Sequence, residues 1–125
     1  MSTSAAARVS RACLQAYVDK DRAAIEALIA DDFHFTSPLD NALDRKTYFE
    51  RCWPNSASMK SFEVVEECGD DRRAFVVYEA SVSSGKRFRN CELHTVRGGK
   101  LVSVEVYFGW DLPHKAKAGG FVAKA

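Results

Sequence analysis

The stretch KRFRNCELHTVRGGKLVSVEVYF, residues 86–108, decides the fold of this 125-residue chain. Polar and apolar side chains alternate on both sides of Gly98-Gly99, which is the pattern of two strands joined by a tight hairpin turn. Two similar runs precede this stretch, separated by short turns that contain glycine or serine. We therefore expect a meander of four consecutive antiparallel strands, at 62–67, 74–83, 86–96 and 101–108.

The first sixty residues follow a different pattern, because apolar side chains recur there every three or four positions, as on one face of a helix. Helices followed by a curled antiparallel sheet predict an α+β fold, with three helices covering one face of the sheet. We expect a helix around 9–17 and then a short helix that begins at Asp21 and is ended by Asp31-Asp32. A strand at 33–36 follows, which Ser37-Pro38 stops, and then a loop. Asp44 caps a third helix, which Pro54 ends, and a second loop spans 54–60.

The length of the chain suits one domain with one hydrophobic core, since 46% of its residues are hydrophobic, and is too short for a second. We expect this domain to span residues 1–113. The tail, residues 114–125, is rich in Lys, Ala and Gly and should be loose, although Phe121 and Val122 could dock on a neighbour.

The charges are balanced, with 18 Lys and Arg against 17 Asp and Glu and no block of one sign. This pattern indicates neither nucleic acid nor an anionic membrane as a partner. No run approaches the roughly 20 apolar residues of a membrane span, and the first ten residues lack an apolar signal segment. The four cysteines lie far apart without zinc-site spacing, which favours reduced thiols in a soluble cytoplasmic protein.

A polar stripe follows the third strand of the meander, where Asn90, Glu92 and His94 share one face by the period of two. If that face lines a pocket, Glu92 could act as a base or donate to a developing oxyanion, with His94 as a second proton carrier. If it faces solvent, the stripe is ordinary surface, and Cys91 and Leu93 turn toward the core.

Other polar candidates have simpler explanations. Glu79 is expected to pair with an arginine of the next strand, and His34 to be exposed or hydrogen-bonded. Asp40 and Asp44 are expected to serve a turn and a helix cap. Five aromatic side chains could line a pocket for a flat apolar ligand or simply fill the core. These five are Tyr48, Phe49, Trp53, Phe75 and Phe108.

The sequence contains no phosphate loop, nucleotide fingerprint, nucleophile elbow or cluster of metal-binding side chains. Neither a cofactor nor a metal is therefore indicated.

Four stretches carry a resemblance to a known family, and they are ADDFHFTSP at 30–38, GKRFRN at 85–90, GKLV at 99–102 and EVYFG at 105–109. With the order of elements, they make the chain resemble the nuclear transport factor 2-like superfamily, in particular its SnoaL-like and ketosteroid-isomerase-like members. The resemblance covers roughly residues 8–113. It implies a cystatin-like α+β roll, in which a cone-shaped, curled antiparallel sheet surrounds one small-molecule pocket and three N-terminal helices cover its concave face.

The resemblance also implies where the catalytic groups of a steroid isomerase would fall. Such enzymes use an Asp before a Pro at the end of the first strand, a Tyr on the first helix and a protonated Asp on a later strand. The corresponding positions here are Ser37, which cannot take up a proton at neutral pH by itself, Cys13, and Glu92, which keeps a carboxyl group. The absence of two groups argues against steroid-type isomerisation by that mechanism.

The register of the last hairpin decides what lies opposite Glu92. A two-residue turn at Gly98-Gly99 places Glu92 opposite Glu105, so that two buried carboxylates would share a proton. A three-residue loop with a bulge shifts the register by one and places Glu92 opposite Val106. The family's arrangement, with the Phe108 position facing the pocket, favours the bulge.

Three hypotheses follow. The first is a cofactor-free enzyme of isomerase, cyclase or lyase type that acts on a small apolar carbonyl or enol-like compound, with Glu92 and His94 as catalytic residues. The second is a non-catalytic ligand-binding module. The third is an interaction domain that forms a homodimer through its outer sheet face and whose own aromatics fill the pocket. The residues expected to bind a ligand are Ser37, Asn90, Tyr48, Trp53, Phe75 and Phe108.

Overall fold

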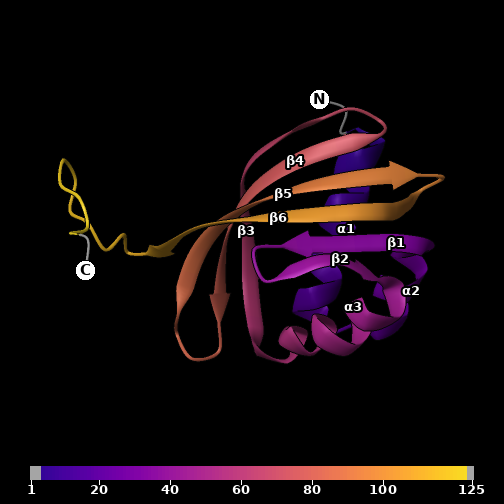
Figure 1. Ribbon diagram of the computed structural model, residues 1–125, viewed down its shortest axis with the longest axis horizontal. Helices are drawn as coiled ribbons and strands as arrows, with labels where there is room; N and C mark the ends of the chain where they lie inside the picture. Colours follow the sequence, from indigo (N-terminus) through magenta and orange to yellow (C-terminus); the bar gives the residue numbers. More distant parts are fainter. Residues whose placement is uncertain (1–3, 124–125) are drawn as a thin grey trace.

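The computed structural model describes residues 4–123, which form three α-helices, one 3-10 helix and one six-stranded sheet (Figure 1). This arrangement confirms the predicted α+β class. The elements are α1 (Ala5–Asp19), α2 (Arg22–Leu28), β1 (Ile29–Ser37), β2 (Asp40–Asp44), α3 (Arg45–Arg51), η1 (Trp53–Ser58), β3 (Met59–Gly69), β4 (Arg73–Val82), β5 (Arg87–Arg97) and β6 (Lys100–Leu112).

The sheet has the strand order β2-β1-β6-β5-β4-β3. Its two edge strands, β2 and β3, do not pair with each other, so the curled sheet does not close into a barrel. The four strands of the expected meander are all antiparallel neighbours. The expected curled antiparallel sheet is confirmed with one exception, because β6 runs parallel to β1. The meander returns to β1 with its fourth strand, which points the same way as β1.

The helices lie inside the curve of the sheet (Figure 1). Helix α1 packs against β3, β4 and β5, while α3 packs against β1. The buried face of α1 carries small side chains such as Ala6, Ser10 and Cys13, which let the helix approach the sheet closely. The predicted caps are confirmed, since Asp21 accepts a hydrogen bond from the Ala24 N–H at 3.1 Å and Asp44 accepts one from the Thr47 N–H at 2.9 Å.

Three expected boundaries were wrong. The second helix ends at Leu28, before Asp31-Asp32, because buried Ile29 already has extended backbone and pairs with Leu101 of β6. The expected loop after Pro38 contains β2, which pairs with β1 as a short hairpin. The loop expected at 54–60 contains most of η1 and the first residues of β3. Long-range pairing with β6 decided the first case, and local spacing does not report such pairing. In the second case β2 is short, mostly polar and largely exposed, so its sequence lacks the apolar alternation of a strand.

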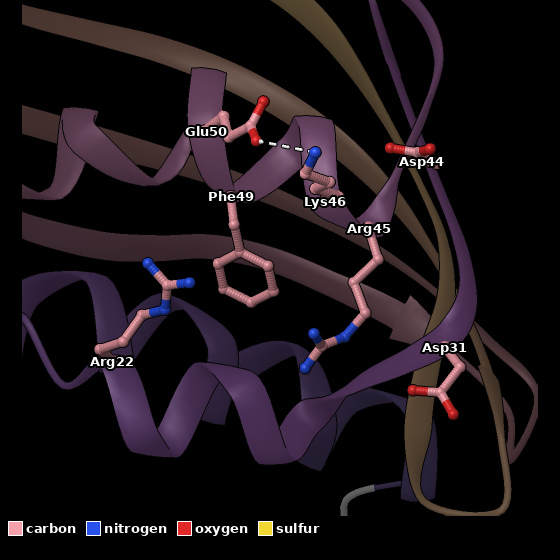
Figure 2. Close-up of a pocket in the computed structure, with 7 residues that line it drawn as sticks. All are labelled: Arg22, Asp31, Asp44, Arg45, Lys46, Phe49 and Glu50. Carbon is pink, nitrogen blue, oxygen red and sulfur yellow. Dashed lines mark ion pairs between the residues drawn. The ribbon is translucent and has the colours of Figure 1, made fainter.

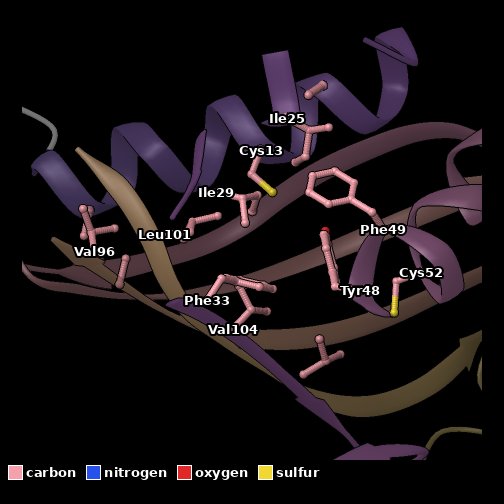
Figure 3. Packing of buried hydrophobic residues seen from close by; sticks show 14 of the residues in the cluster. Cys13, Ile25, Ile29, Phe33, Tyr48, Phe49, Cys52, Val96, Leu101 and Val104 are labelled. Carbon is pink, nitrogen blue, oxygen red and sulfur yellow. The ribbon is translucent and has the colours of Figure 1, made fainter. Parts of the chain in front are cut away.

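The main hydrophobic core lies between the helices and the sheet (Figure 3). Ile25, Ile29, Phe33 and Leu101 are each at most 1% exposed. The rings of Phe33 and Tyr48 meet edge to face with centroids 4.9 Å apart, a favourable geometry for aromatic pairs. This packing fixes α3 against β1, and Tyr48 extends from it toward the interior of the cone.

Beyond Leu112, no helix or strand occurs up to residue 123, and the tail runs away from the sheet (Figure 1). Phe121 is 87% exposed and Val122 is 57% exposed, and their docking on a neighbour stays a prediction. The division of the chain into a domain at 1–113 and a loose tail at 114–125 also stays a prediction. Residues 1–3 of that domain and residues 124–125 of that tail lie outside the described part of the chain. Within residues 4–123, no helix is long and apolar enough to cross a membrane.

Candidate functional site

A cavity of about 160 Å³ lies between the helices and the concave face of the sheet. Its wall is mainly aromatic and apolar, and Glu92 is the only acidic or basic side chain that lines it within residues 4–123. The lining residues are Cys13, Leu14, Tyr17, Phe35, Tyr48, Cys52, Asn55, Met59, Phe62, Tyr78, Phe88, Asn90, Glu92, Val104 and Val106.

The polar stripe of β5 faces this interior. Asn90 and Glu92 line the cavity, and His94 is fully buried beside them. Strand β4 adds Tyr78 and Val76 to the same face of the sheet, since Tyr78 pairs with Asn90 and Val76 pairs with Glu92. The alternative in which the stripe faces solvent is therefore wrong.

The last hairpin combines the two registers that the sequence left open. Arg97 pairs with Lys100 around a two-residue turn, as one alternative required. The ladder then skips Val102, because Val96 pairs with Leu101 but Thr95 pairs with Ser103. The bulge expected in the loop thus lies inside β6, where one extra residue shifts every later pair.

A chain of hydrogen bonds runs from α1 to the cavity wall. Ser10 Oγ and His94 Nδ1 are 2.5 Å apart, and His94 Nε2 and Glu92 Oε1 are 2.7 Å apart. The Tyr78 hydroxyl donates to Glu92 Oε2 at 2.6 Å, and Asn90 Nδ2 donates to that hydroxyl at 3.4 Å. Both carboxylate oxygens of Glu92 are therefore held in place, while its side chain keeps 14% of its surface exposed.

Two tyrosines form a second polar group on the helical side of the cavity. The hydroxyls of Tyr17 and Tyr48 are 2.5 Å apart, and either can donate. Because one donates to the other, the accepting hydroxyl keeps its own hydrogen for another partner. Tyr17 lies one turn after Cys13 on α1, so a first-helix tyrosine does line the cavity, which corrects the expectation that this group is missing.

Burial keeps the hydroxyls and the thiol around Glu92 uncharged. It raises the pKa of Tyr17 and of Tyr48 well above the usual value of a tyrosine, and that of Tyr78 too, where the Glu92 charge adds to the effect. Burial and then the Glu92 charge raise the pKa of the Cys13 thiol. The cavity thus offers neutral donors around one carboxylate.

The other predicted ligand-binding residues divide into two groups. Tyr48 and Asn90 line the cavity. Phe108, which is 53% exposed, lines an adjoining hollow of about 350 Å³, and this hollow shares Phe88 and Asn90 with the cavity. Ser37, Trp53 and Phe75 do not line it.

Each of these three has a physical reason to lie elsewhere. The Ser37 hydroxyl donates to Asp40 at 3.0 Å and accepts from the Leu39 N–H at 3.0 Å, so it stabilises the β1–β2 turn. Trp53 stands behind the wall, with its ring 4.9 Å from that of Tyr17. Phe75 is 51% exposed on the outer face, because alternation along β4 sends Ala74 and Val76 inward.

Sequence reasoning missed Ser10, Tyr78 and Asn55 as site residues. Tyr78 could have been found, since the period of two places it on the same face as Val76 and Ala80, which are both buried. Ser10 is a polar residue on the inward face of α1, three positions before Cys13. Asn55 gave no signal, because η1 was expected to be a loop.

Other expectations about polar residues were confirmed. Glu79 forms ion pairs with Arg87 and Arg89 on the outer face, and His34 is exposed. Asp40 holds the β1–β2 turn through Ser37 and pairs with Arg51. Within residues 4–123, no group of three or more His, Cys, Asp or Glu side chains could hold a metal ion.

A larger hollow of about 640 Å³ lies on the outside of the molecule (Figure 2). The Arg22 and Arg45 guanidiniums lie over the Phe49 ring at 4.3 and 4.9 Å. Arg45 also donates to the carbonyls of Ile29 and Glu26 near the end of α2, and Lys46 pairs with Glu50. These charges hold the helices together and are exposed to water, so we place the candidate site in the smaller cavity on the concave face of the sheet.

An open, curled α+β sheet with helices on its concave face and a cavity between them defines the class of the protein, the nuclear transport factor 2-like fold. The chain belongs to the SnoaL-like domain family, whose model matches residues 10–104. No curated protein matches the chain.

Solved structures with the same fold are distant in sequence. A putative ketosteroid isomerase from Kribbella flavida is 13% identical with a TM-score of 0.73, over 97% of this chain and 90% of the other. An LEH-like epoxide hydrolase from M. tuberculosis is 17% identical with a TM-score of 0.71, over 84% and 83%. A computationally designed 17-OHP binder is 18% identical with a TM-score of 0.73, over 86% and 93%. At these identities the likeness shows the fold alone.

Proposed function

We propose that this domain is a cofactor-free enzyme that moves a proton within a small, largely apolar carbonyl or enol-like compound. The observation that carries the proposal is the position of Glu92, whose carboxylate lies at the wall of an aromatic cavity with both oxygens held by buried partners. A carboxylate fixed in this way is suited to repeated proton transfer at one place.

The neighbouring groups supply the remaining roles. Each Glu92 oxygen accepts one bond from the protein and keeps a further lone pair, which can take a proton from a carbon next to a carbonyl group. The enolate oxygen then accepts a hydrogen bond from the Tyr17–Tyr48 pair. Glu92 returns the proton to another carbon, and the product is an isomer, while His94 holds Oε1 of Glu92 in place from behind the cavity wall.

The size of the cavity limits the substrate. A cavity of about 150 Å³ holds one benzene molecule, so the 160 Å³ here suits a single ring. The adjoining hollow beside Phe108 could receive a substituent of that ring. A fused, steroid-sized ring system would need the cavity to open.

Isomerisation of cyclohex-3-enone tests the proposal, because the conjugated product, cyclohex-2-enone, is detected by its ultraviolet absorbance. We expect the protein to accelerate this reaction and Glu92→Gln to lower kcat at least about 100-fold, the usual contribution of a positioned base. Glu105→Gln, on the outer face, is the matched control. Equal rates with Glu92→Gln and the unaltered protein would contradict a catalytic role.

A non-catalytic binding module is the second candidate. Both Glu92 oxygens already have protein partners, and Ser37 stands where isomerases of this superfamily keep a base. Saturable binding of cyclohexanone without turnover of cyclohex-3-enone would favour this candidate.

We also propose that the protein is a cytoplasmic homodimer. Half-exposed Phe75 and Tyr107 lie on the outer face of the sheet, and Leu93 lies between them as the strand partner of Phe75. A second copy could cover this face.

The four free cysteines support a reducing compartment.

A further inference from the structure

Ser10 and His94 form a fully buried polar pair behind Glu92. Each is 0% exposed, and neither lines the cavity. Their atoms Oγ and Nδ1 are 2.5 Å apart, although 84 positions separate them in the sequence. Because buried polar groups are costly without partners, this contact needs an explanation beyond packing.

With a neutral His94 imidazole, counting hydrogens distinguishes two arrangements of the chain from Ser10 to Glu92. In the first, Glu92 is ionised and accepts from the Tyr78 hydroxyl and from His94 Nε2–H, so that Nδ1 is a bare acceptor and Ser10 donates to it. In the second, Glu92 is protonated and donates to Nε2, so that Nδ1–H donates to Ser10.

The surroundings favour the first arrangement. In the second, the Ser10 hydrogen has no acceptor in the described part of the chain, whereas in the first every hydrogen of the three residues has one.

Titratable groups from the other elements bring no charge of their own. They are Cys13 and Tyr17 from α1, Tyr48 from α3, Cys52 at the C-cap of α3 and Tyr78 from β4, all neutral, while β6 contributes only Val104 and Val106.

We propose that Ser10 is a positioning residue whose hydroxyl donates to His94 Nδ1 and so fixes the Nε2–H tautomer, which keeps Glu92 ionised and directed into the cavity. Ser10 and His94 act through Glu92 and need not touch a substrate. The effect on reaction rate rests on the proposed function, but the tautomer does not.

The wild-type protein provides the first test through ¹⁵N NMR of the imidazole nitrogens at pH 7. We expect His94 to carry hydrogen on Nε2 and a lone pair on Nδ1, with slow exchange of the Nε2 hydrogen. Its signals are separable from those of exposed His34 and His114. A hydrogen on Nδ1, with or without one on Nε2, would overturn the proposal, even in an active enzyme.

Variants provide the second test. In Ser10→Ala, we expect the Nε2 hydrogen to exchange at least about tenfold faster and kcat for cyclohex-3-enone to fall about tenfold with KM little changed. Ser10→Thr restores the hydroxyl and should recover both values, while Ser56→Ala, which removes a buried serine elsewhere, should change neither.

The two readouts separate this proposal from the proposed function. If Ser10→Ala leaves both exchange and kcat unchanged, Ser10 is not a positioning residue. If the enone is not turned over but the tautomer and the exchange rates are as expected, the proposed function fails and the role of Ser10 stands. Should Ser10→Ala not fold, the wild-type tautomer still decides.

Discussion

Glu92 pairs with Val106 across the last hairpin, and the extra residue Val102 in β6 is the reason. Without the bulge, Glu105 would lie opposite Glu92 inside the cone. Instead Glu105 pairs with Leu93 on the outer face and accepts a hydrogen bond from Tyr107 at 2.7 Å. One bulged residue thus separates two carboxylates and leaves a single one at the cavity.

Deletion of Val102 should therefore damage the fold severely. The deletion turns Val104 and Val106 outward and Glu105 inward beside Glu92, because a shift of one residue exchanges the faces of a strand. We expect the free energy of unfolding, measured with urea, to fall by more than about 4 kcal/mol. Deletion of Gly119 in the tail is the control, and equal stability of the two deletions would contradict this account.

Tyr78→Phe should show what the buried bond to Glu92 contributes. The hydroxyl donates at 2.6 Å from a side chain that is 4% exposed, so its loss should lower the free energy of unfolding by about 1–2 kcal/mol. Tyr107→Phe removes an equivalent bond to Glu105 from a 53% exposed side chain and should cost less than about 0.5 kcal/mol. Similar losses in the two variants would count against a special role of the cavity bond.

The single charge of the cavity predicts selection among ligands of equal size. Cyclohexanecarboxylate would bring a second negative charge next to Glu92, whereas cyclohexanol and cyclohexylammonium would not. We expect calorimetry at pH 7 to show at least about tenfold weaker binding of the carboxylate than of the alcohol. Glu92→Gln should reduce the difference in affinity between the carboxylate and the alcohol. If the carboxylate binds the unaltered protein as tightly as the alcohol does, the cavity beside Glu92 is not the binding site.

The cysteines should react with iodoacetamide at different rates. Cys68 is exposed and should be labelled first. Burial raises the pKa of Cys52 from 9.0 to about 11, which lowers its thiolate fraction at pH 8 about 100-fold, so its labelling should be slow and should accelerate as the pH rises toward 11. Buried Cys13 lines the cavity and should be protected further by cyclohexanone. Mass spectrometry measures each site, and fast labelling of Cys52 at pH 8 would refute this order.

The proposed dimer predicts an effect of Phe75→Ser on mass in solution. We expect sedimentation velocity to show a dimer for the unaltered protein and a monomer for Phe75→Ser, which removes an apolar side chain from the outer face. Leu39→Ser changes a more exposed residue in the β1–β2 turn and should stay dimeric. A monomeric unaltered protein at high concentration would exclude the dimer.

The sequence was informative wherever neighbours along the chain decide the structure. Asp21 and Asp44 were recognised as caps because the hydrogen bond of a cap reaches only three residues ahead. β2 was missed because its five residues, Asp40–Asp44, are mostly polar and largely exposed and so show no apolar alternation. Phe75 was expected in the pocket because composition does not reveal the face on which an aromatic side chain lies.

Residues 86–108 determined by themselves that two strands pair around Gly98-Gly99 and that Asn90, Glu92 and His94 share one face, since the period of a strand is local. Only the tertiary structure decided that this face turns inward, because inward is defined by the helix that packs against it. The same packing brings Ser10 to His94 and Tyr17 to Tyr48, and the bulge at Val102 sets the residue opposite Glu92. Contacts between distant segments depend on the simultaneous packing of the whole chain, which no short stretch encodes alone.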